Sequence, residues 1–389
     1  QRICSPRLAA VTGMSSGREG VDLRMRWVVL VVGGALWLSS GQPGHAQTPA
    51  ASSAPVASAE GAPSVKLPPD AELPKLLELP AIKPEPVDPV AAKELTHLLA
   101  KLTSPKADIR AAARKELAEV SPNAVGAIAS RIEDIRQRID RDRAPRLLGD
   151  VRKAARKDKK GKGAKDADDE SQDDWLIFLH EQAKPEDETW RDLVELTSIV
   201  RMLGHIGTTP ALREMIALRG KFGDLLRIDI SRQIATLKDK AVPALIEARR
   251  NDAKVVARFA ELELDRLGRA IPGEAVASPD ADVLADVLRA FGYVRDVDAV
   301  GVCLSFANHD RRKVRDAARQ AIAGIGEASR WQLRDTLQDL TGEKVDKSVP
   351  WDILARRIFH LYDQARSAEL TALANSGLQA QAAERFEEA

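Results

Sequence analysis

The sequence predicts an all-α protein. Apolar residues recur at steps of three and four through most of the 389-residue chain, and no strand-like alternation stands out. Aromatic residues make up only 4% of the chain, so the core is expected to be aliphatic. Helix-length segments also align with one another inside the chain without gaps, as expected for stacked helix pairs.

Residues 1–46 are expected to precede the mature protein. The chain starts with Gln1, and Met25 offers a better beginning, because the apolar run at residues 27–38 follows it closely. This is the pattern of a secretory signal peptide, with a cut between Ala46 and Gln47. Twelve apolar residues are fewer than the roughly 20 that a spanning helix needs. We therefore expect an exported protein, periplasmic or associated with the cell envelope, with an uncleaved N-terminal anchor as the alternative.

The cysteines predict a fold held by packing alone. Cys4 lies in the upstream segment, which leaves Cys303 as the one cysteine of the expected mature chain. An exported chain with one thiol forms no internal disulfide. Cys303 aligns with Met215 in the internal repeat described below, so we expect a small core residue and not a reactive thiolate.

Two segments are expected to be irregular. Residues 47–92 contain ten of the 21 prolines, which predicts a disordered or polyproline-like linker. Residues 151–174 are basic in their first half and acidic in their second, which predicts a flexible insertion. Deleting residues 157–174 is accordingly expected to change stability little.

A first helix type recurs three times. Residues 109–132 align with residues 226–249, and the segment "VRDAARQAIAGIG" at residues 314–326 joins them. The alignment makes Leu117, Ile234 and Ile322 equivalent, and each is expected to be buried. It also makes three arginines equivalent, namely Arg110, Arg227 and Arg315.

A second helix type occurs twice. Residues 199–216 align with residues 287–304, which places Gly204 on Gly292. Because glycine adopts the left-handed conformation at little cost, each glycine is expected to close its helix.

The pattern in "DRRKVRDAARQAIAGIG", with the "LG.IG…A…L" turn of the preceding pair, resembles the HEAT-repeat family. The resemblance covers residues 90–342 and implies an α-solenoid domain at 93–342. It also implies that the three equivalent arginines brace the turn of a neighbouring repeat. Arg311, Arg312 and Lys313 precede the helix and are expected to be solvated.

Residues 351–389 are expected to form C-terminal helices. The tail "GLQAQAAERFEEA" resembles the first part of a tetratricopeptide repeat, with Gly377, Ala380, Phe386 and Ala389 at its small, small, aromatic and alanine positions. This resemblance implies a second helix beginning near Phe386 and a protein that continues past Ala389. Glu384 departs from the glycine usual at the turn, so a plain amphipathic helix is the alternative.

Composition and motifs favour a protein that binds and does not catalyse. Fifty-nine basic against 58 acidic residues give a net charge of +1, so the chain as a whole has no strong positive potential that would attract nucleic acid. The six histidines are isolated, and His180–Glu181 is the single His-Glu dipeptide, whereas the deoxyhypusine hydroxylases hold two irons with several. No phosphate loop, CxxC or GxSxG motif occurs outside the leader.

The expected function is a non-enzymatic scaffold that binds a protein partner, with no catalytic, cofactor-binding or metal-binding residue. The sequence assigns no residue to the partner site. Trp175 and Trp190 either anchor a helix pair or contact the partner. Two alternatives stay open. One is a module tethered to a membrane by the N-terminal anchor, and the other is a HEAT-like repeat enzyme similar to the phycobilin lyases or the alkylpurine DNA glycosylases.

Overall fold

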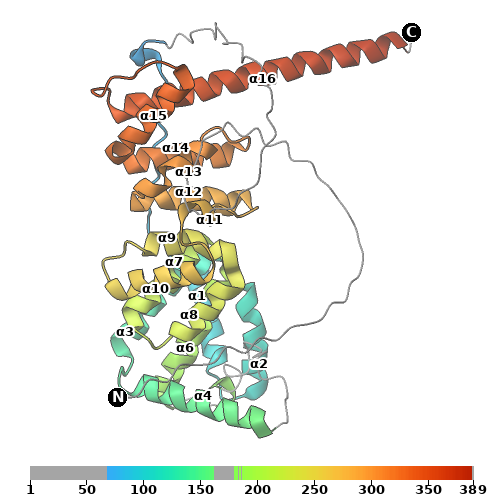
Figure 1. Cartoon of the computed structure of the whole chain (residues 1–389). Helices are drawn as coiled ribbons and strands as arrows, with labels where there is room; N and C mark the ends of the chain where they lie inside the picture. Colours follow the sequence, from blue (N-terminus) through green and yellow to red (C-terminus); the bar gives the residue numbers. More distant parts are fainter. Residues whose placement is uncertain (1–67, 162–178, 183, 185, 388–389) are drawn as a thin grey trace, which may run out of the picture. The chain divides into compact units, whose positions relative to one another are not determined.

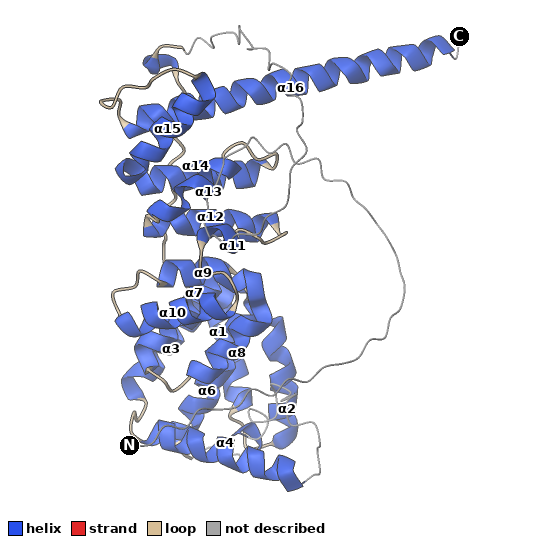
Figure 2. Cartoon of the chain, viewed as in Figure 1, coloured by secondary structure: helices blue, strands red, loops and turns tan. Residues whose placement is uncertain are grey.

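The computed structural model describes residues 68–161, 179–182, 184 and 186–387. The described residues are helical and contain no strand, as the sequence predicts (Figure 2). The leader at residues 1–46, residues 162–174 of the expected insertion, and Trp175 lie outside them. Among the described residues, no helix is both long and apolar enough to cross a membrane.

The helices of the first part are α1 (Pro89–Leu102), α2 (Ala107–Glu116), α3 (Val125–Arg138), α4 (Arg143–Gly161), α6 (Glu188–Ile206), α7 (Thr209–Phe222), α8 (Arg227–Leu237), α9 (Val242–Ala248) and α10 (Lys254–Arg266). They are followed by α11 (Pro272–Ala275), α12 (Ala281–Val294), α13 (Val300–Phe306), α14 (Arg312–Ile325), α15 (Arg330–Thr341) and α16 (Trp351–Glu387). Each helix contacts mainly helices close to it in the chain, as α6 does α7 and α8, and α14 does α12 and α13 (Figure 1).

One local pattern recurs along the chain. A helix ends in a short 3-10 turn and the next helix starts at once, as in α8, η4 (Lys238–Ala241) and α9. The same order occurs in α12, η5 (Val297–Ala299) and α13, and in α14, η6 (Gly326–Ser329) and α15. A single hydrophobic core runs through these units.

The predicted core positions are confirmed. Leu117 exposes 2% of its surface, and Ile234 and Ile322 expose none. Cys303 is fully buried, and burial raises the pKa of its thiol to about 12, so it remains an inert core residue. Trp190 is also fully buried, and its indole nitrogen donates to the carbonyl oxygen of Leu179 at 3.2 Å. Trp190 therefore anchors the core.

Gly204 and Gly292 do not close their helices. Both lie inside helices, α6 and α12, and the left-handed residues come three positions later, at Gly207 (φ 60°) and Arg295 (φ 51°). The sequence interpretation was therefore wrong about the role of these glycines. Instead, Gly204 faces Gln233 of α8 and Gly292 faces Ala321 of α14, as described below.

Two expected irregular segments are partly structured. Residues 151–161 continue α4, where Val151 is buried and Arg152 bonds Asp229 of α8 at 2.7 Å. Lysine, arginine and alanine are good helix formers. The prediction of a flexible insertion considered the charge of this segment and not its helix propensity. Residues 68–88 of the expected linker contact the helices, and α1 begins inside the linker range, at Pro89.

The end of the described chain is one uninterrupted helix. α16 continues through Gly377 and Glu384, where the tetratricopeptide resemblance implies a turn and a second helix. Leu370, Leu373 and Leu378 are 58–64% exposed on it.

Candidate functional site

The most distinctive surface of the described residues is the face that holds residues 70–88, here called the strap. The strap begins with the single-turn helix η1 (Asp70–Glu72) and then runs without regular secondary structure to α1. η1 is drawn in blue in Figure 1, near α15 and α16. The strap touches helices that are far apart in the sequence. Its contacts are bonds from arginines, packing of leucines, and close approach to glycines of the helices.

Two arginines of α16 hold the start of the strap. Arg356 donates to the carbonyl oxygens of Asp70 (2.8 Å), Leu73 and Pro74 (2.9 Å). Arg357 donates to the Asp70 carboxylate at 2.8 and 2.9 Å. Because Arg356 bonds only backbone oxygens, it recognises an extended chain whatever its side chains are.

Leucines at every third position form the second contact. Leu73, Leu76 and Leu79 follow Asp70 at equal steps of three. Leu73 has φ −66° and ψ 139°, which lies in the polyproline II region, where three residues make one turn. Leu73 is 4% exposed, and Leu76 packs against the core. A polyproline-like chain thus presents one leucine-bearing face to the helices.

Leu79 lies where α12 and α14 cross. A side-chain carbon at Gly292 would lie 3.0 Å from Leu79 Cδ2, and one at Gly324 would lie 2.7 Å from it. The same carbon at Gly292 would also lie 2.8 Å from Ala321 Cα of the crossing helix. These two glycines therefore let the helix backbones approach and make room for the leucine.

The far end of the strap passes over α3. A side-chain carbon at Gly126 would lie 2.3 Å from the carbonyl oxygen of Pro86 and 2.6 Å from that of Glu85. Asp88 then caps α1 by accepting from the backbone nitrogen of Val90 at 2.9 Å. Glycine is thus found at three points of strap contact, in the first turn of α3 and inside α12 and α14.

The basic residues that the repeats carry mostly serve the fold. Arg110 donates to the carbonyl oxygens of Ser104 and Pro105, which lie six and five residues before it. Arg315 donates to His309 and Asp310 at the same two offsets. Arg110 and Arg315 therefore bond in equivalent ways, but each fixes the turn before its own helix, whereas the family resemblance implied the turn of a neighbouring repeat.

Arg227 does not form this brace and is exposed. The prediction was wrong there because α8 starts at Arg227 itself, whereas α2 and α14 start three residues before their arginines. The turn before α8 is bonded from the other side, by Arg219 to the Gly223 carbonyl oxygen. Arg311, Arg312 and Lys313 are exposed, as predicted.

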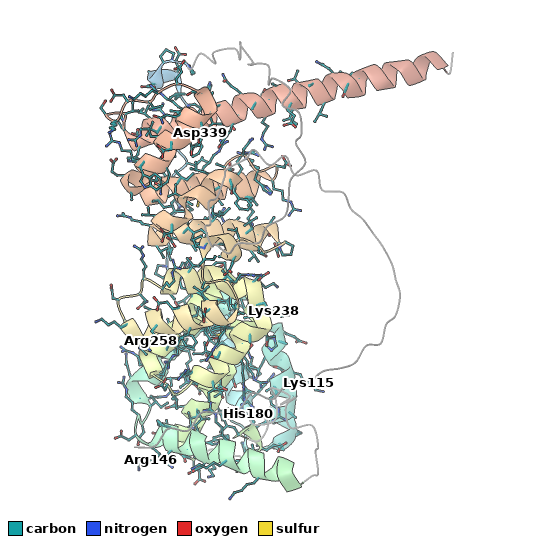
Figure 3. The ribbon with its side chains drawn as sticks, viewed as in Figure 1. Lys115, Arg146, His180, Lys238, Arg258 and Asp339 are labelled. Carbon is teal, nitrogen blue, oxygen red and sulfur yellow. The ribbon has the colours of Figure 1, made fainter. Side chains whose placement is uncertain are left out.

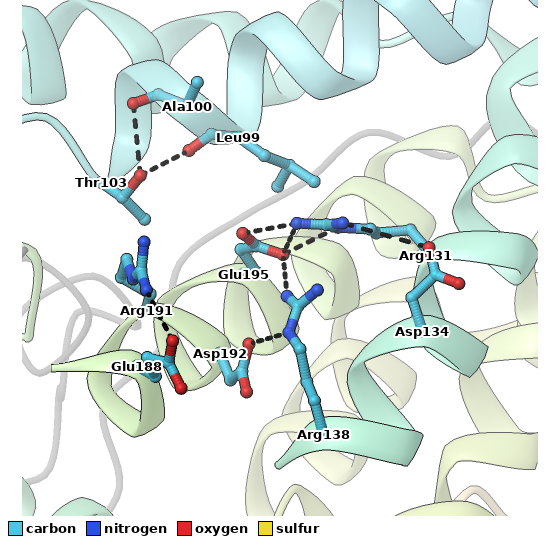
Figure 4. Close-up of polar contacts among 10 residues, drawn as sticks. All are labelled: Leu99, Ala100, Thr103, Arg131, Asp134, Arg138, Glu188, Arg191, Asp192 and Glu195. Carbon is cyan, nitrogen blue, oxygen red and sulfur yellow. Dashed lines mark hydrogen bonds and ion pairs between the residues drawn. The ribbon is translucent and has the colours of Figure 1, made fainter.

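Arginine–carboxylate pairs join helices that are not successive in the chain; Figure 4 shows the pairs between α3 and α6. Arg131 of α3 donates twice to the Glu195 carboxylate of α6, at 2.9 Å each, and Arg138 donates to Asp192 at 2.7 Å and to Glu195 at 3.2 Å. Asp192 is 3% exposed, and its burial raises its pKa despite the bond from Arg138. Arg213 pairs with Glu247 and Arg319 with Asp363 in the same bidentate way. In these pairs oppositely charged side chains bond across helix contacts, so the charged residues contribute to helix packing.

His180 is a fully buried imidazole among arginines (Figure 3). Burial lowers the pKa of this imidazole most, the charges of Arg114, Arg201 and Arg110 also lower it, and together they bring it to about 3. The imidazole is therefore neutral at neutral pH, with Ser198 Oγ at 3.5 Å from Nε2. Among the described residues, no group of three or more histidines, cysteines and carboxylates is placed to hold a metal ion.

Comparison with protein-family models returns no match for this chain, and comparison with curated proteins returns no similar sequence. The candidate site therefore stands on geometry. Sequence reasoning missed the strap. The signals that point to it are the three-residue spacing of Leu73, Leu76 and Leu79 between prolines, and the glycines inside helical patterns.

Proposed function

We propose that this chain is an α-solenoid of HEAT-type repeats that binds a protein partner along its strap-bearing face, without catalysing a reaction. The recurring helix, 3-10 turn and helix order and the equal bonding of Arg110 and Arg315 support the repeat assignment. In such an array each pair of helices packs on its neighbours, and successive pairs offer a long surface.

The observation that carries the proposal is the set of bonds from Arg356 to three carbonyl oxygens of the strap, one in η1 and two in the irregular chain that follows it. Backbone bonds combined with apolar seats for spaced side chains are how proteins commonly hold extended peptides. The face therefore has the chemistry of polypeptide binding.

Photo-crosslinking in cells that express the chain tests this proposal. A photoreactive amino acid replaces Ile82 on the strap in one variant and Leu262 of α10 in a matched control, which are 44% and 43% exposed. We expect one defined protein adduct from position 82 and none from position 262. Identical adducts from both positions, or none from either, would contradict a partner at this face.

We also propose that the chain works outside the cytoplasm, from the leader pattern at residues 27–46. Sequencing the N-terminus of protein from the cell envelope tests this. A start at Gln47 supports cleavage and export. A retained apolar run in the membrane fraction would replace free export by a membrane tether.

A further inference from the structure

We infer that the strap is an exchangeable ligand of its own chain, and that the partner binds in its place with a segment of the same chemistry. That segment begins with a single helical turn, continues without regular secondary structure, and carries the pattern Asp-x-x-Leu-x-x-Leu-x-x-Leu of residues 70–79. The inference rests on the proposed function and adds the class of ligand and the competitor that controls access.

The four residues of the pattern share one face of the strap. Asp70, Leu73, Leu76 and Leu79 each contact the helices, which places all four on the same face of the strap. Asp70 meets Arg357, Leu73 is buried, and Leu79 lies over the glycines at the crossing of α12 and α14. At these three positions the helices offer a suitable contact: an arginine for the carboxylate, and a buried or glycine-lined surface for the leucines.

The residues between these positions carry little of the binding. Leu77 is 42% exposed although it is apolar, and beyond the pattern Ile82 and Val87 are 44% and 54% exposed. The Arg356 bonds go to backbone oxygens, which any peptide offers. A partner therefore needs the three-residue spacing and an extended backbone, and the other side chains are free to differ.

The strap is held less firmly than the helices and is suited to displacement. Among residues 70–88, Leu73 is the one buried residue. The strap leads directly into α1 at Pro89, so it competes as an intramolecular ligand, and short tethers give effective concentrations on the order of millimolar. The apparent affinity of a partner segment is lowered by the fraction of chains whose strap is bound.

The test uses the full chain and a fluorescent peptide with the sequence of residues 68–88. In the strap variant, Leu73→Asp and Leu79→Asp release the strap, and circular dichroism checks that the helices remain. Fluorescence anisotropy should show at least about tenfold tighter peptide binding to this variant than to the unchanged chain, because the internal competitor is lost. Equal affinities for the two chains would overturn the inference.

Two controls separate this face from general stickiness. Adding Arg356→Gln to the strap variant should weaken peptide binding at least about tenfold, whereas adding Arg258→Gln, at an exposed position of α10, should leave it unchanged. A peptide of the same composition with its leucines out of the three-residue register should bind at least about tenfold more weakly. Equal binding of both peptides would refute the pattern.

If the double variant loses its helices, Asp70→Asn provides the second test, because it removes the charged partner of Arg357 and leaves the leucines. The peptide should then bind about two- to threefold tighter than to the unchanged chain, and no gain would overturn the inference. If peptide binding fails while position 82 still crosslinks a partner, the proposed function stands and the ligand pattern is wrong. If both fail, the face is not a binding surface.

Discussion

Helices α6 and α12 align in sequence, yet their equivalent glycines do different work. A side-chain carbon at Gly204 would meet the end of a flexible side chain, Gln233 Oε1, at 2.3 Å. At Gly292 it would meet backbone, Ala321 Cα, at 2.8 Å. Gln233 and Ala321 are themselves equivalent in the alignment of α8 with α14. The role of a glycine in these pairs is therefore set by the residue that the facing helix, α8 or α14, presents to it.

The largest expected effect tests whether α8 and α14 are the same kind of helix. Ile234→Ala and Ile322→Ala should each lower the free energy of unfolding by about 2 to 5 kcal/mol, because both side chains are fully buried. Urea denaturation measures the loss, and hydrogen exchange should confine it to the mutated helix and its neighbours.

The control is Val255→Ala, since Val255 is 45% exposed, and it should change stability by less than about 0.5 kcal/mol. A loss at one isoleucine close to that of the control would mean that the two helices are not equivalent.

The sequence predicts well what a single helix needs. Apolar spacing identified the all-α class and the burial of Leu117, Ile234 and Ile322. It could not predict the role of Gly204 and Gly292, because a missing side chain shows its purpose only when the crossing helix is placed. Periodicity within a helix carries no information about that partner.

The strap was missed for a related reason. Proline-rich composition predicts a lack of regular secondary structure, and residues 73–88 indeed have none. Composition does not say whether such a chain lies on a surface. The bonds from Arg356 join residues more than 280 positions apart, and no local pattern reports contacts at that distance.

The second prediction tests directly whether Gly204 and Gly292 differ in their roles. Gly292→Ala should lower the free energy of unfolding by about 1 to 3 kcal/mol, because the added carbon meets backbone that cannot move alone. Gly204→Ala should be neutral or stabilising by up to about 1 kcal/mol, because Gln233 can turn away and alanine favours a helix. Thermal denaturation of the two variants measures the difference. Equal losses would show that both helix crossings are equally tight.

The third prediction concerns pH and distinguishes the α6 region from the α12 region. Because the pKa of folded His180 is lowered to about 3, the unfolded chain takes up its proton first, near pH 6.5. The contribution to stability is complete above pH 6.5 and is lost as pH falls, by about 1.4 kcal/mol per pH unit.

The carboxylates of the chain add their own pH dependence, so the measurement is a difference. Between pH 7 and pH 5.5, the chain should lose more stability than His180→Gln, whose side chain does not titrate. Hydrogen exchange should show the difference at α6 and not at α12. Equal pH dependence in the two chains would mean that the imidazole is protonated in the fold.

The smallest expected effect lies at the C-terminal ends of α8 and α14, the helices that face Gly204 and Gly292. Gly326 closes α14 with φ 67° and ψ −136°, and Lys238 closes α8 at the equivalent position with φ 51° and ψ −120°. This region suits glycine and costs a residue with a side chain about 1 kcal/mol or more. Lys238 is exposed, so its side chain gives little in return. Lys238→Gly should therefore raise the free energy of unfolding by about 1 kcal/mol, less the added entropy of the unfolded chain.

The reverse change, Gly326→Lys, should lower stability by at least about 1 kcal/mol through backbone strain. A steric clash is not the cause, because a side-chain carbon there would lie 3.8 Å from the nearest atom of Trp351, an ordinary contact. Lys240→Gly is the matched control, since Lys240 is exposed in η4 without a positive φ, and it should be destabilising. If Lys238→Gly destabilises the chain as much as Lys240→Gly does, then α8 does not end in the backbone conformation of α14, and the equivalence of the two helix ends fails.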